Sequence, residues 1–368
     1  MNFSPLKDYL HSLKEEWSVP GNAMVVRIGH ETVFENFENA KRDDVYWIYS
    51  ATKVFTATLF CRFLEEGKLH LEDKVSDFLP EYKNLQIALL DGTCIPAKNE
   101  LTLGHLVTMC GGLTYNIMHD AIRTAEDKST VGVSRAVAKM PLIAEPGETF
   151  NYSLCHDVLA GVMEVAAGER FSDMIRRQIT EPLGMTSTTF HPEGEIEKRF
   201  TPQYAWDGEK KQAVPVPCVN HFRFSPDFES GGAGLCSTLD DYSLLAEALA
   251  NDGLTKDGYR LLKPETIAEM KKNRLVTFVQ KQGFDRCWGA RHRSYGYGLG
   301  VRTRIDYTDE GLSPLGEFGW DGAAGAYCMV DTENHISAFY VQHVLNMGPV
   351  YDVIHPTLRN LIYKCVKE

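Results

Sequence analysis

The sequence predicts an α+β fold in which both ends of the chain build one antiparallel sheet. Two strand-like segments near the N-terminus are joined by a tight turn at Gly29 and His30, and further strand-like segments come after about Ala290. Between them, the pattern from Ser50 onward is mostly helical, with glycine- and proline-rich loops. The expected strands are residues 23–29, 32–37, 295–303, 326–330 and 336–344. Early and late strands separated by helices favour a sheet with an inserted helical region.

Helices are expected at both ends of the chain. Residues 4–18 have the periodicity of an amphipathic helix, and residues 356–365 form a final helix. A chain of 368 residues is long enough for about two domains. We expect a sheet domain made of residues 1–72 and 290–368 and a mainly helical domain made of residues 73–289.

The composition excludes several classes of function. Hydrophobic residues make up 43% and charged residues 24%, as in globular proteins, and the formal net charge is −12. No basic run or stripe suggests binding to nucleic acid. No apolar stretch is long enough to span a membrane, and the first residues lack the apolar core of a signal peptide. We therefore expect a cytoplasmic protein without a membrane or nucleic-acid partner.

Cysteine and histidine give no sign of a metal or cofactor site. The nine cysteines include no C-x-x-C pair, and several lie in apolar runs, as in proteins of a reducing compartment. The twelve histidines show no spacing typical of metal ligands. His292, His335 and His343 are expected to be surface or loop residues. We expect no metal and no cofactor.

The stretch "VYWIYSATKVFTATLFCRFLEEGKL" (Val45–Leu69) places a lysine inside a helix that looks buried. Its apolar residues cover nearly the whole circumference, with Ser50 placed to cap the helix and Gly67 to end it. A buried ammonium is costly unless it is paired or takes part in chemistry. No acidic residue lies three or four positions from Lys53. Hydrogen bonds to distant core groups are the alternative explanation.

Ser50 and Lys53 form an S-x-x-K motif, which alone is a weak signal. A second copy, Ser4 to Lys7, contains a proline and begins a polar helix that would not desolvate its lysine. In the Ser50 copy, positions i and i+3 share one face of a buried helix. Burial disfavours the charged form of an amine, so such a lysine can take a proton from the serine. Ser50 is therefore the candidate nucleophile.

Two further segments could contribute to a site. Tyr152 precedes Ser153, which is placed to cap an apolar helix; a tyrosine there is either catalytic or a packing residue. In "FGWDGAAGAYCMVD", Gly319, Gly322 and Gly325 recur every third residue before a strand. Such glycines either let a backbone approach a ligand or mark an ordinary entry into a strand.

Taken in order, these segments resemble the serine β-lactamase and penicillin-binding-protein superfamily over nearly the whole chain. More narrowly, the chain resembles class C β-lactamase-like serine hydrolases and the related family VIII carboxylesterases. The segments that carry the resemblance are "YSATKVFTATLFCRFLEEGKLHLEDKVSDFLPEY", "LTLGHLVTMCGGLTY", "EPLGMTSTTF" and "SGGAGLCSTLDDYSLLAEAL". Several such segments in the right order are far more specific than one S-x-x-K.

The resemblance implies a β-lactamase/transpeptidase-like fold: a five-stranded antiparallel sheet flanked by helices, a mainly helical domain, and an active site in the cleft between them. It implies Ser50 as nucleophile, Lys53 as its partner and Tyr152 as a second general acid/base. The backbone N–H groups of Ser50 and Ala323 would form the oxyanion hole.

Departures from the family pattern bear on the substrate. The usual Y-x-N reads Tyr152-Ser153-Leu154, and the usual K-T-G reads Trp320-Asp321-Gly322. An amide and a cation that would bind a β-lactam are thus absent, and W-x-G is shared with the esterases. We expect Leu154, Trp320, Asp321 and Gly322 to line the substrate pocket.

The expected function is a carboxylesterase that acts on small or medium acyl esters, with a small-molecule ester or amide as substrate. A β-lactamase or D-amino-acid peptidase is the first alternative. A non-catalytic member that binds ligands or serves as a scaffold is the second.

Overall fold

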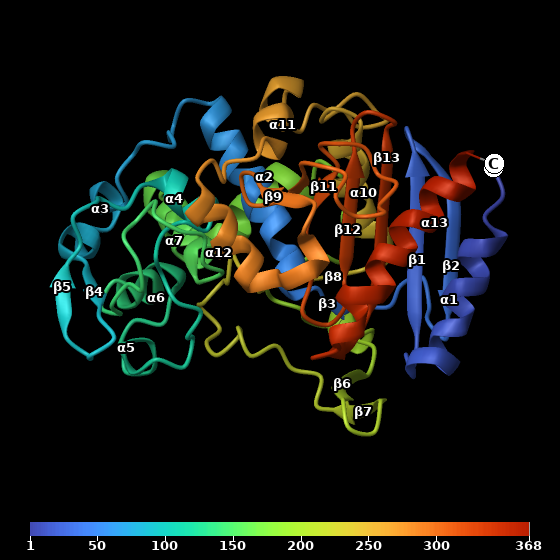
Figure 1. The fold of residues 1–368 in the computed structure, drawn as a ribbon, viewed down its shortest axis with the longest axis horizontal. Coiled ribbons are helices and arrows are strands. Elements are labelled where there is room, and N and C mark those ends of the chain that lie inside the picture. The colour runs from blue at the N-terminus through green and yellow to red at the C-terminus, as the bar shows by residue number, and fades with distance from the viewer. Residues whose placement is uncertain (368) are drawn as a thin grey trace.

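A sheet built from both ends of the chain dominates one side of the computed structural model (Figure 1). The structure describes residues 1–367 apart from the side chains of residues 290 and 291. Its strand order is β2-β1-β13-β12-β11-β10-β9, and each neighbouring pair is antiparallel. The strands are β1 (Asn22–Ile28), β2 (Glu31–Glu38), β9 (Tyr295–Tyr297), β10 (Arg302–Arg304), β11 (Phe318–Gly319), β12 (Tyr327–Asp331) and β13 (Ile336–Gln342).

The α+β class and the sheet made from both chain ends are confirmed, but the sheet has seven strands rather than five. One additional strand, at the edge of the sheet, arises because the chain reverses within the expected strand 295–303 and forms two strands, β9 and β10. Gly298 N–H donates to the Val301 carbonyl at 2.8 Å, and Gly300 has φ +79°. This turn folds β9 back on β10 and widens the sheet by short strands.

Helices cover both faces of the sheet because successive side chains of a strand point to opposite sides. Met24 and Val26 of β1 pack with α1 (Ser4–Trp17) and α13 (His355–Lys367), which also contact each other. Val25 faces the other side, which α10 (Leu239–Ala250) covers. There the Tyr242 ring stacks on Phe339 with centroids 3.9 Å apart.

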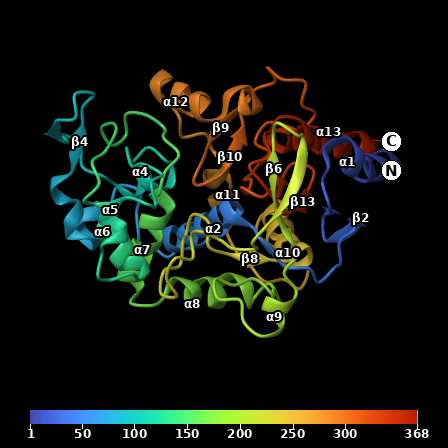
Figure 2. The ribbon, with the colours of Figure 1, turned by 90° about the horizontal axis from the view of Figure 1, so that it is seen from below.

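Helix α2 (Thr52–Glu65) runs through the middle of the molecule, between the sheet and the helical region (Figures 1 and 2). All but one of its first twelve residues are buried, as the sequence predicts, and Gly67 follows its end with φ +64°. The prediction that Ser50 caps the helix is wrong. A 3₁₀ turn, η1 (Tyr49–Ala51), precedes α2 and makes Ala51 the N-cap, without a side-chain capping bond.

The region between β2 and β9 is mostly helical, as expected, but also contains small strands. Three small sheets pair β3 (Tyr46–Trp47) with β8 (Cys236–Ser237), β4 (Gln86–Ala88) with β5 (Cys94–Pro96), and β6 (Gln203–Asp207) with β7 (Gln212–Val216) and β14 (Val344–Leu345). The helices are α3 (Val75–Phe78), α4 (Leu103–Val107), α5 (Asp120–Arg123), α6 (Thr130–Val137), α7 (Cys155–Ala167), α8 (Phe171–Ile175), α9 (Glu195–Lys198), α11 (Pro264–Lys271) and α12 (Phe278–Trp288). Short 3₁₀ or π turns are η2 (Pro80–Asn84), η3 (Arg176–Thr180), η4 (Gly289–His292) and η5 (Val350–Ile354).

Two local expectations in this region need comment. Ser153 does not cap α7; Leu154 is the N-cap, without a side-chain bond. The division into residues 1–72 with 290–368 and residues 73–289 stays a prediction. Helix α10, from within the second segment, packs on the sheet.

The three histidines expected to be surface or loop residues lie in turns or between strands, and two of them are buried there. His292 is 7% and His343 is 3% exposed, whereas His335 lies in a turn with φ +53°. Burial lowers the pKa of His343 to about 4, which keeps its ring neutral near pH 7. Within the described residues, no group of three or more histidine, cysteine, aspartate or glutamate side chains is arranged to hold a metal ion.

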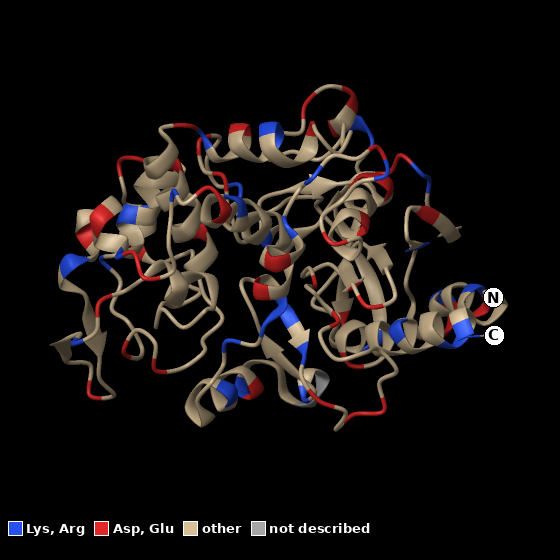
Figure 3. Cartoon of the chain, turned by 90° about the horizontal axis from the view of Figure 1, so that it is seen from above, with Lys and Arg blue, Asp and Glu red and all other residues tan. Residues whose placement is uncertain are grey.

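Charged residues of both signs are interspersed over the outer elements of the molecule (Figure 3). Among residues 1–367, no helix combines the length and the apolar character needed to cross a membrane.

Candidate active site

Ser50 and Lys53 meet at the start of α2. The Lys53 Nζ lies 3.3 Å from the Ser50 Oγ and donates to the Gly232 carbonyl at 2.7 Å. The lysine is fully buried, and the residue before the serine, Tyr49, has φ +44°. Strained backbone of this kind is concentrated at functional sites. The 3₁₀ turn thus directs the serine hydroxyl to the lysine rather than to the end of the helix.

Two tyrosine rings lie next to the side-chain nitrogen of Lys53. The Lys53 Nζ lies 4.6 Å from the Tyr152 ring centroid and 5.6 Å from that of Tyr115, and the two rings stack 5.2 Å apart. Burial, with smaller contributions from Tyr152 and Asp157, raises the pKa of Tyr115 well above its usual value, although a hydrogen bond with Ser50 opposes this. Tyr115 is a site residue that the sequence did not single out, although it ends the family-like segment "LTLGHLVTMCGGLTY".

An acidic residue does accompany Lys53, but from a distant part of the chain. Asp157, on α7, is buried and accepts hydrogen bonds from the Ser230 hydroxyl and, at 3.3 Å, from the Gly232 N–H. Burial raises the pKa of Asp157, and the Lys53 charge partly offsets this. The neighbouring His156 has its pKa lowered to about 3 by burial and by Lys53, so its ring is neutral near pH 7.

Trp320 connects the strand β11 to Tyr152. Its indole Nε1–H donates to the Tyr152 hydroxyl oxygen at 3.1 Å, and the rings lie 5.7 Å apart. This bond orients the phenolic oxygen of Tyr152, which lies in the segment before α7.

The Asp321 carboxylate is held by buried basic groups. Its Oδ1 lies 2.9 Å from Arg302 Nη1, and its Oδ2 lies 3.6 Å from His292 Nε2. Arg302 is itself buried and also donates to the Cys328 carbonyl. Arg302 therefore balances the negative charge of Asp321.

A cavity of about 180 Å³ joins most of these residues. It contains three of the four expected pocket residues, but not Leu154, which is 1% exposed and packs in the hydrophobic core. The expectation for Leu154 is therefore wrong, because the start of α7 turns it inward. Trp288, His292 and Tyr351 are lining residues that no sequence pattern indicated. The cavity is lined by Ser50, Tyr152, Trp288, His292, Trp320, Asp321, Gly322, Ala323 and Tyr351.

Ser50 and Ala323, the residues expected to supply the oxyanion-hole N–H groups, line this cavity together. Gly322, next to Ala323, lies so close to the chain before Ser50 that an added Cβ would be 2.2 Å from the Ile48 carbonyl oxygen. The Gly322 carbonyl accepts a hydrogen bond from the Tyr351 hydroxyl at 2.8 Å. Glycine at this position therefore permits the two segments to approach each other.

Gly322→Ala is expected to destabilise the protein by about 1–3 kcal/mol and to lower its hydrolytic activity, because the methyl group would separate these two segments. Urea unfolding and kcat/KM on an ester measure both effects. Gly208→Ala is the matched control, since a Cβ there meets no atom closer than 3.9 Å. Unchanged stability and activity in Gly322→Ala would contradict the close approach.

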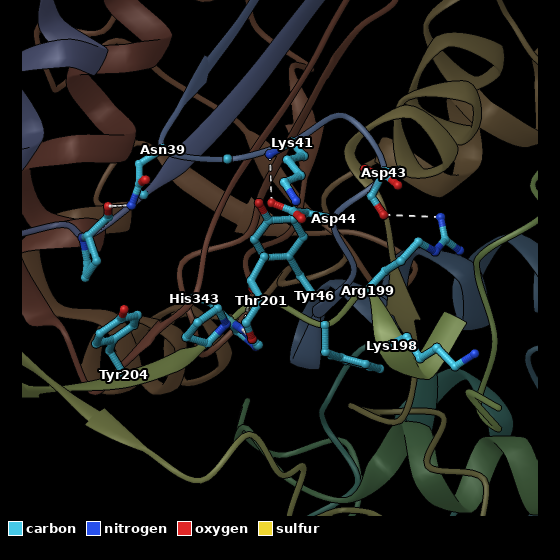
Figure 4. Close-up of a pocket in the computed structure, with 15 residues that line it drawn as sticks. Asn39, Lys41, Asp43, Asp44, Tyr46, Lys198, Arg199, Thr201, Tyr204 and His343 are labelled. Atoms are coloured by element: carbon cyan, nitrogen blue, oxygen red, sulfur yellow. Dashed lines mark hydrogen bonds between the residues drawn. The ribbon is translucent and has the colours of Figure 1, made fainter. Parts of the chain in front are cut away.

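A larger cavity of about 620 Å³ lies between the loop after β2 and the segment that follows α9 (Figure 4). Its lining includes Lys41, Asp44, Arg199 and the buried His343, but no serine or cysteine. The Arg199 guanidinium donates to the Asp43 carbonyl at 3.2 Å, and the Lys41 N–H donates to the Asp44 carboxylate at 2.7 Å. The Thr201 hydroxyl lies 3.0 Å from His343 Nδ1 here, but the lining has no counterpart of the Ser50, Lys53 and Tyr152 arrangement, so we do not take this cavity as the candidate for acyl transfer.

Curated relatives match most of the chain. It is 28% identical over 343 residues to esterase EstB of Burkholderia gladioli, covering 84% of this chain and 79% of that protein. It is 28% identical over 360 residues to acyltransferase calJ of Penicillium decumbens, covering 89% and 82%.

Solved structures show the same fold. EstCE1, described as a hydrolase with promiscuous acyltransferase activity, superposes with a TM-score of 0.79 at 21% identity and covers 98% of both chains. A variant of simvastatin synthase from Aspergillus terreus superposes with a TM-score of 0.82 at 20% identity, covering 99% of this chain and 98% of that one. The family model Beta-lactamase matches residues 6–354. The chain therefore belongs to the Beta-lactamase family.

Proposed function

We propose that the protein is a serine hydrolase that works through an acyl-enzyme and acts as a carboxylesterase on small or medium acyl esters. The observation that carries the proposal is the contact of the Ser50 hydroxyl with the buried Lys53 amine, 3.3 Å apart, at a cavity that Tyr152 and Ala323 also line. A nucleophile in contact with a base, next to a third polar group and backbone donors, is the arrangement that acyl transfer requires.

In the acylation step, the Ser50 Oγ bonds to the ester carbonyl carbon, and its proton passes to the Lys53–Tyr152 pair. The backbone N–H groups of Ser50 and Ala323 stabilise the negative oxygen of the tetrahedral intermediate. The bond to the alcohol then breaks, and the alcohol oxygen takes the proton. The 3.3 Å contact of Lys53 Nζ with the Ser50 Oγ gives the proton its first acceptor, and Tyr152 lines the same cavity as Ser50.

Deacylation reverses these roles. A water molecule gives its proton to the Lys53–Tyr152 pair as its oxygen bonds to the acyl carbon. The bond to Ser50 breaks, the serine oxygen takes the proton, and the carboxylic acid leaves. The Trp320 N–H keeps the Tyr152 oxygen oriented during both steps.

The charges around the cavity favour a neutral substrate. The positive charge of Arg302 is already paired with Asp321 and Glu317, and its guanidinium also donates to the Cys328 carbonyl. No described lysine or arginine lines the cavity, so a substrate carboxylate would lose its water without gaining a cation there. A simple ester carries no such carboxylate.

We expect p-nitrophenyl acetate or butyrate to be hydrolysed with a much higher kcat/KM than nitrocefin or benzylpenicillin. A hydrogen bond to a charged group contributes about 1.5–3 kcal/mol, so its absence weakens transition-state binding of the β-lactam about ten- to a hundredfold. Side-by-side kcat/KM values at one pH test this. If nitrocefin matches the short esters, the protein is a β-lactamase or peptidase instead. A fluorophosphonate probe that fails to label the protein would favour a non-catalytic member.

Acyl transfer to an alcohol is a second candidate, favoured by the 28% identity to acyltransferase calJ over 89% of this chain. The acyl-enzyme is the same, and an alcohol replaces water in the second step. Incubation with vinyl butyrate and a primary alcohol, followed by mass spectrometry, separates the candidates. Butyric acid as the product supports the hydrolase, and a butyrate ester of the added alcohol supports the transferase.

A further inference from the structure

Strand β11 ends just before the segment that enters the candidate site. It has only two residues, and the last of them, Gly319, is paired with Arg302 of β10. The next four residues, Trp320 to Ala323, all line the cavity beside Ser50. The backbone ladder with β10 stops before these residues, so side-chain contacts decide how they lie relative to that strand.

The Arg302 side chain supplies such a contact. Its guanidinium lies 2.9 Å from the carboxylate of Asp321, which follows β11, and 3.4 Å from that of Glu317, which precedes it. It also donates to the Cys328 carbonyl of β12 at 3.1 Å. One buried group thus joins both ends of β11 to the next strand. A guanidinium presents five N–H donors in a planar fork, whereas a lysine ammonium is a compact point charge that does not span three separate acceptors.

Aromatic rings pack against this guanidinium. Its central carbon lies 4.9 Å from the Tyr327 ring centroid and 5.6 Å from that of Tyr295. Contacts between a cation and an aromatic ring are favourable, and more so where water is excluded. Arg302 is 1% exposed, so the contacts are made away from solvent. The guanidinium therefore has a defined position from which it can hold Asp321.

We infer that Arg302 is a positioning residue for the reaction and that it acts through Asp321. The inference rests on the proposed function and adds to it a residue outside the cavity lining. Asp321 directly follows Trp320, whose indole donates to the Tyr152 hydroxyl. Two residues further on, Ala323 is the proposed second donor to the oxyanion. A displacement of about 1 Å can lower a rate about 100-fold, so loss of the Arg302 contact should impair the chemical step rather than ester binding.

The first test compares Arg302→Lys with Arg304→Lys. Arg304 is the matched control, because it lies on the same strand and is also 1% exposed. Its guanidinium is paired with Asp309 at 2.6 Å, and Asp309 does not line the cavity. Each change therefore shortens a buried arginine that has an ion pair, but only one of the two pairs reaches the candidate site.

We expect kcat on p-nitrophenyl butyrate to fall about 10–100-fold in Arg302→Lys, and kcat/KM to fall by the same factor, as when an interaction of the transition state is lost. In Arg304→Lys, kcat should stay close to that of the unmodified protein. A merely structural role of Arg302 would instead give the two variants similar losses.

The second test is a double-mutant cycle of Arg302→Met and Asp321→Ala. Effects of two residues that act independently multiply in kcat, whereas those of two residues in one network do not. If Arg302 acts through Asp321, the double variant should lose no more kcat than the more impaired single variant. Losses that multiply would show that the two residues act separately, and this result overturns the inference.

Circular dichroism and thermal unfolding check that each variant is folded. If Arg302→Met does not fold, Arg302→Lys and Asp321→Asn decide the question, since both keep a polar side chain in the pair. Unchanged kcat in folded Arg302→Lys, or an equal loss in Arg304→Lys, overturns the inference while leaving the esterase proposal intact. Absence of ester hydrolysis by the unmodified protein would instead contradict the proposed function, and the inference with it.

Discussion

Ser50→Ala is expected to abolish ester hydrolysis, with a loss of about 10⁶-fold in kcat, the size found when the nucleophile of a serine hydrolase is removed. The hydroxyl is the one group that can carry the acyl chain next to Lys53, and alanine leaves the 3₁₀ turn and α2 without a steric change. The measurement is kcat on p-nitrophenyl butyrate together with labelling by a fluorophosphonate probe.

Ser4→Ala is the matched control, because Ser4 and Lys7 repeat the S-x-x-K spacing on the exposed side of α1. We expect this variant to hydrolyse esters and to react with the probe as the unmodified protein does. Mass spectrometry that finds the probe on any residue other than Ser50 would show that the nucleophile is misassigned.

Tyr152→Phe and Lys53→Ala are each expected to lower kcat by about 10²–10⁴-fold, the usual contribution of a general acid or base. Tyr152→Phe is the sharper variant. It keeps the ring against Lys53 and Trp288 and removes only the hydroxyl that Trp320 contacts. Steady-state kinetics across the pH range will show whether the loss is in kcat, as a chemical role requires.

Tyr297→Phe is the matched control for the tyrosine. Its ring also lies edge-on to Trp320 at 5.1 Å, and its buried hydroxyl has no hydrogen-bond partner among the described residues. We expect its kcat to stay close to that of the unmodified protein. Near-normal turnover in Tyr152→Phe, or an equal loss in Tyr297→Phe, would mean that Tyr152 only packs against its neighbours.

Lys53→Ala also removes a long buried side chain that donates to the Gly232 carbonyl. Truncation of a large buried side chain to alanine destabilises proteins by about 2–5 kcal/mol. Circular dichroism and urea unfolding must therefore accompany the kinetics. Lys53→Met, which keeps the volume of the side chain, separates the loss of chemistry from the loss of packing.

Predictions from local patterns were right where one element decides the outcome. The two strands β1 and β2 joined by a tight turn, the buried circumference of α2 and the end of that helix near Gly67 each depend on residues close in sequence. The predicted caps at Ser50 and Ser153 were wrong because a cap is not decided within one element. A cap depends on the path of the chain before the helix, and at Tyr49 that path is set by contacts outside the element.

The pocket shows where such patterns give no information. Trp288 and His292 come from the end of α12 and the turn after it, and no period or spacing relates them to Ser50. Leu154 was placed in the pocket by its position two residues after Tyr152, where the family pattern has asparagine, yet at the start of α7 it points into the core. Two residues along the chain are enough to exchange pocket for core.

By itself, the sequence determined the sheet from both chain ends, the buried helix with Ser50 and Lys53 on one face, and the glycines before β12. These features follow from side chains close in sequence, whose relative positions the backbone geometry fixes. Only the tertiary structure decided that Asp157 accompanies Lys53, that Arg302 balances Asp321, and that Trp288 lines the cavity. Those pairs are far apart in the chain, so their contacts depend on how complete elements pack against one another.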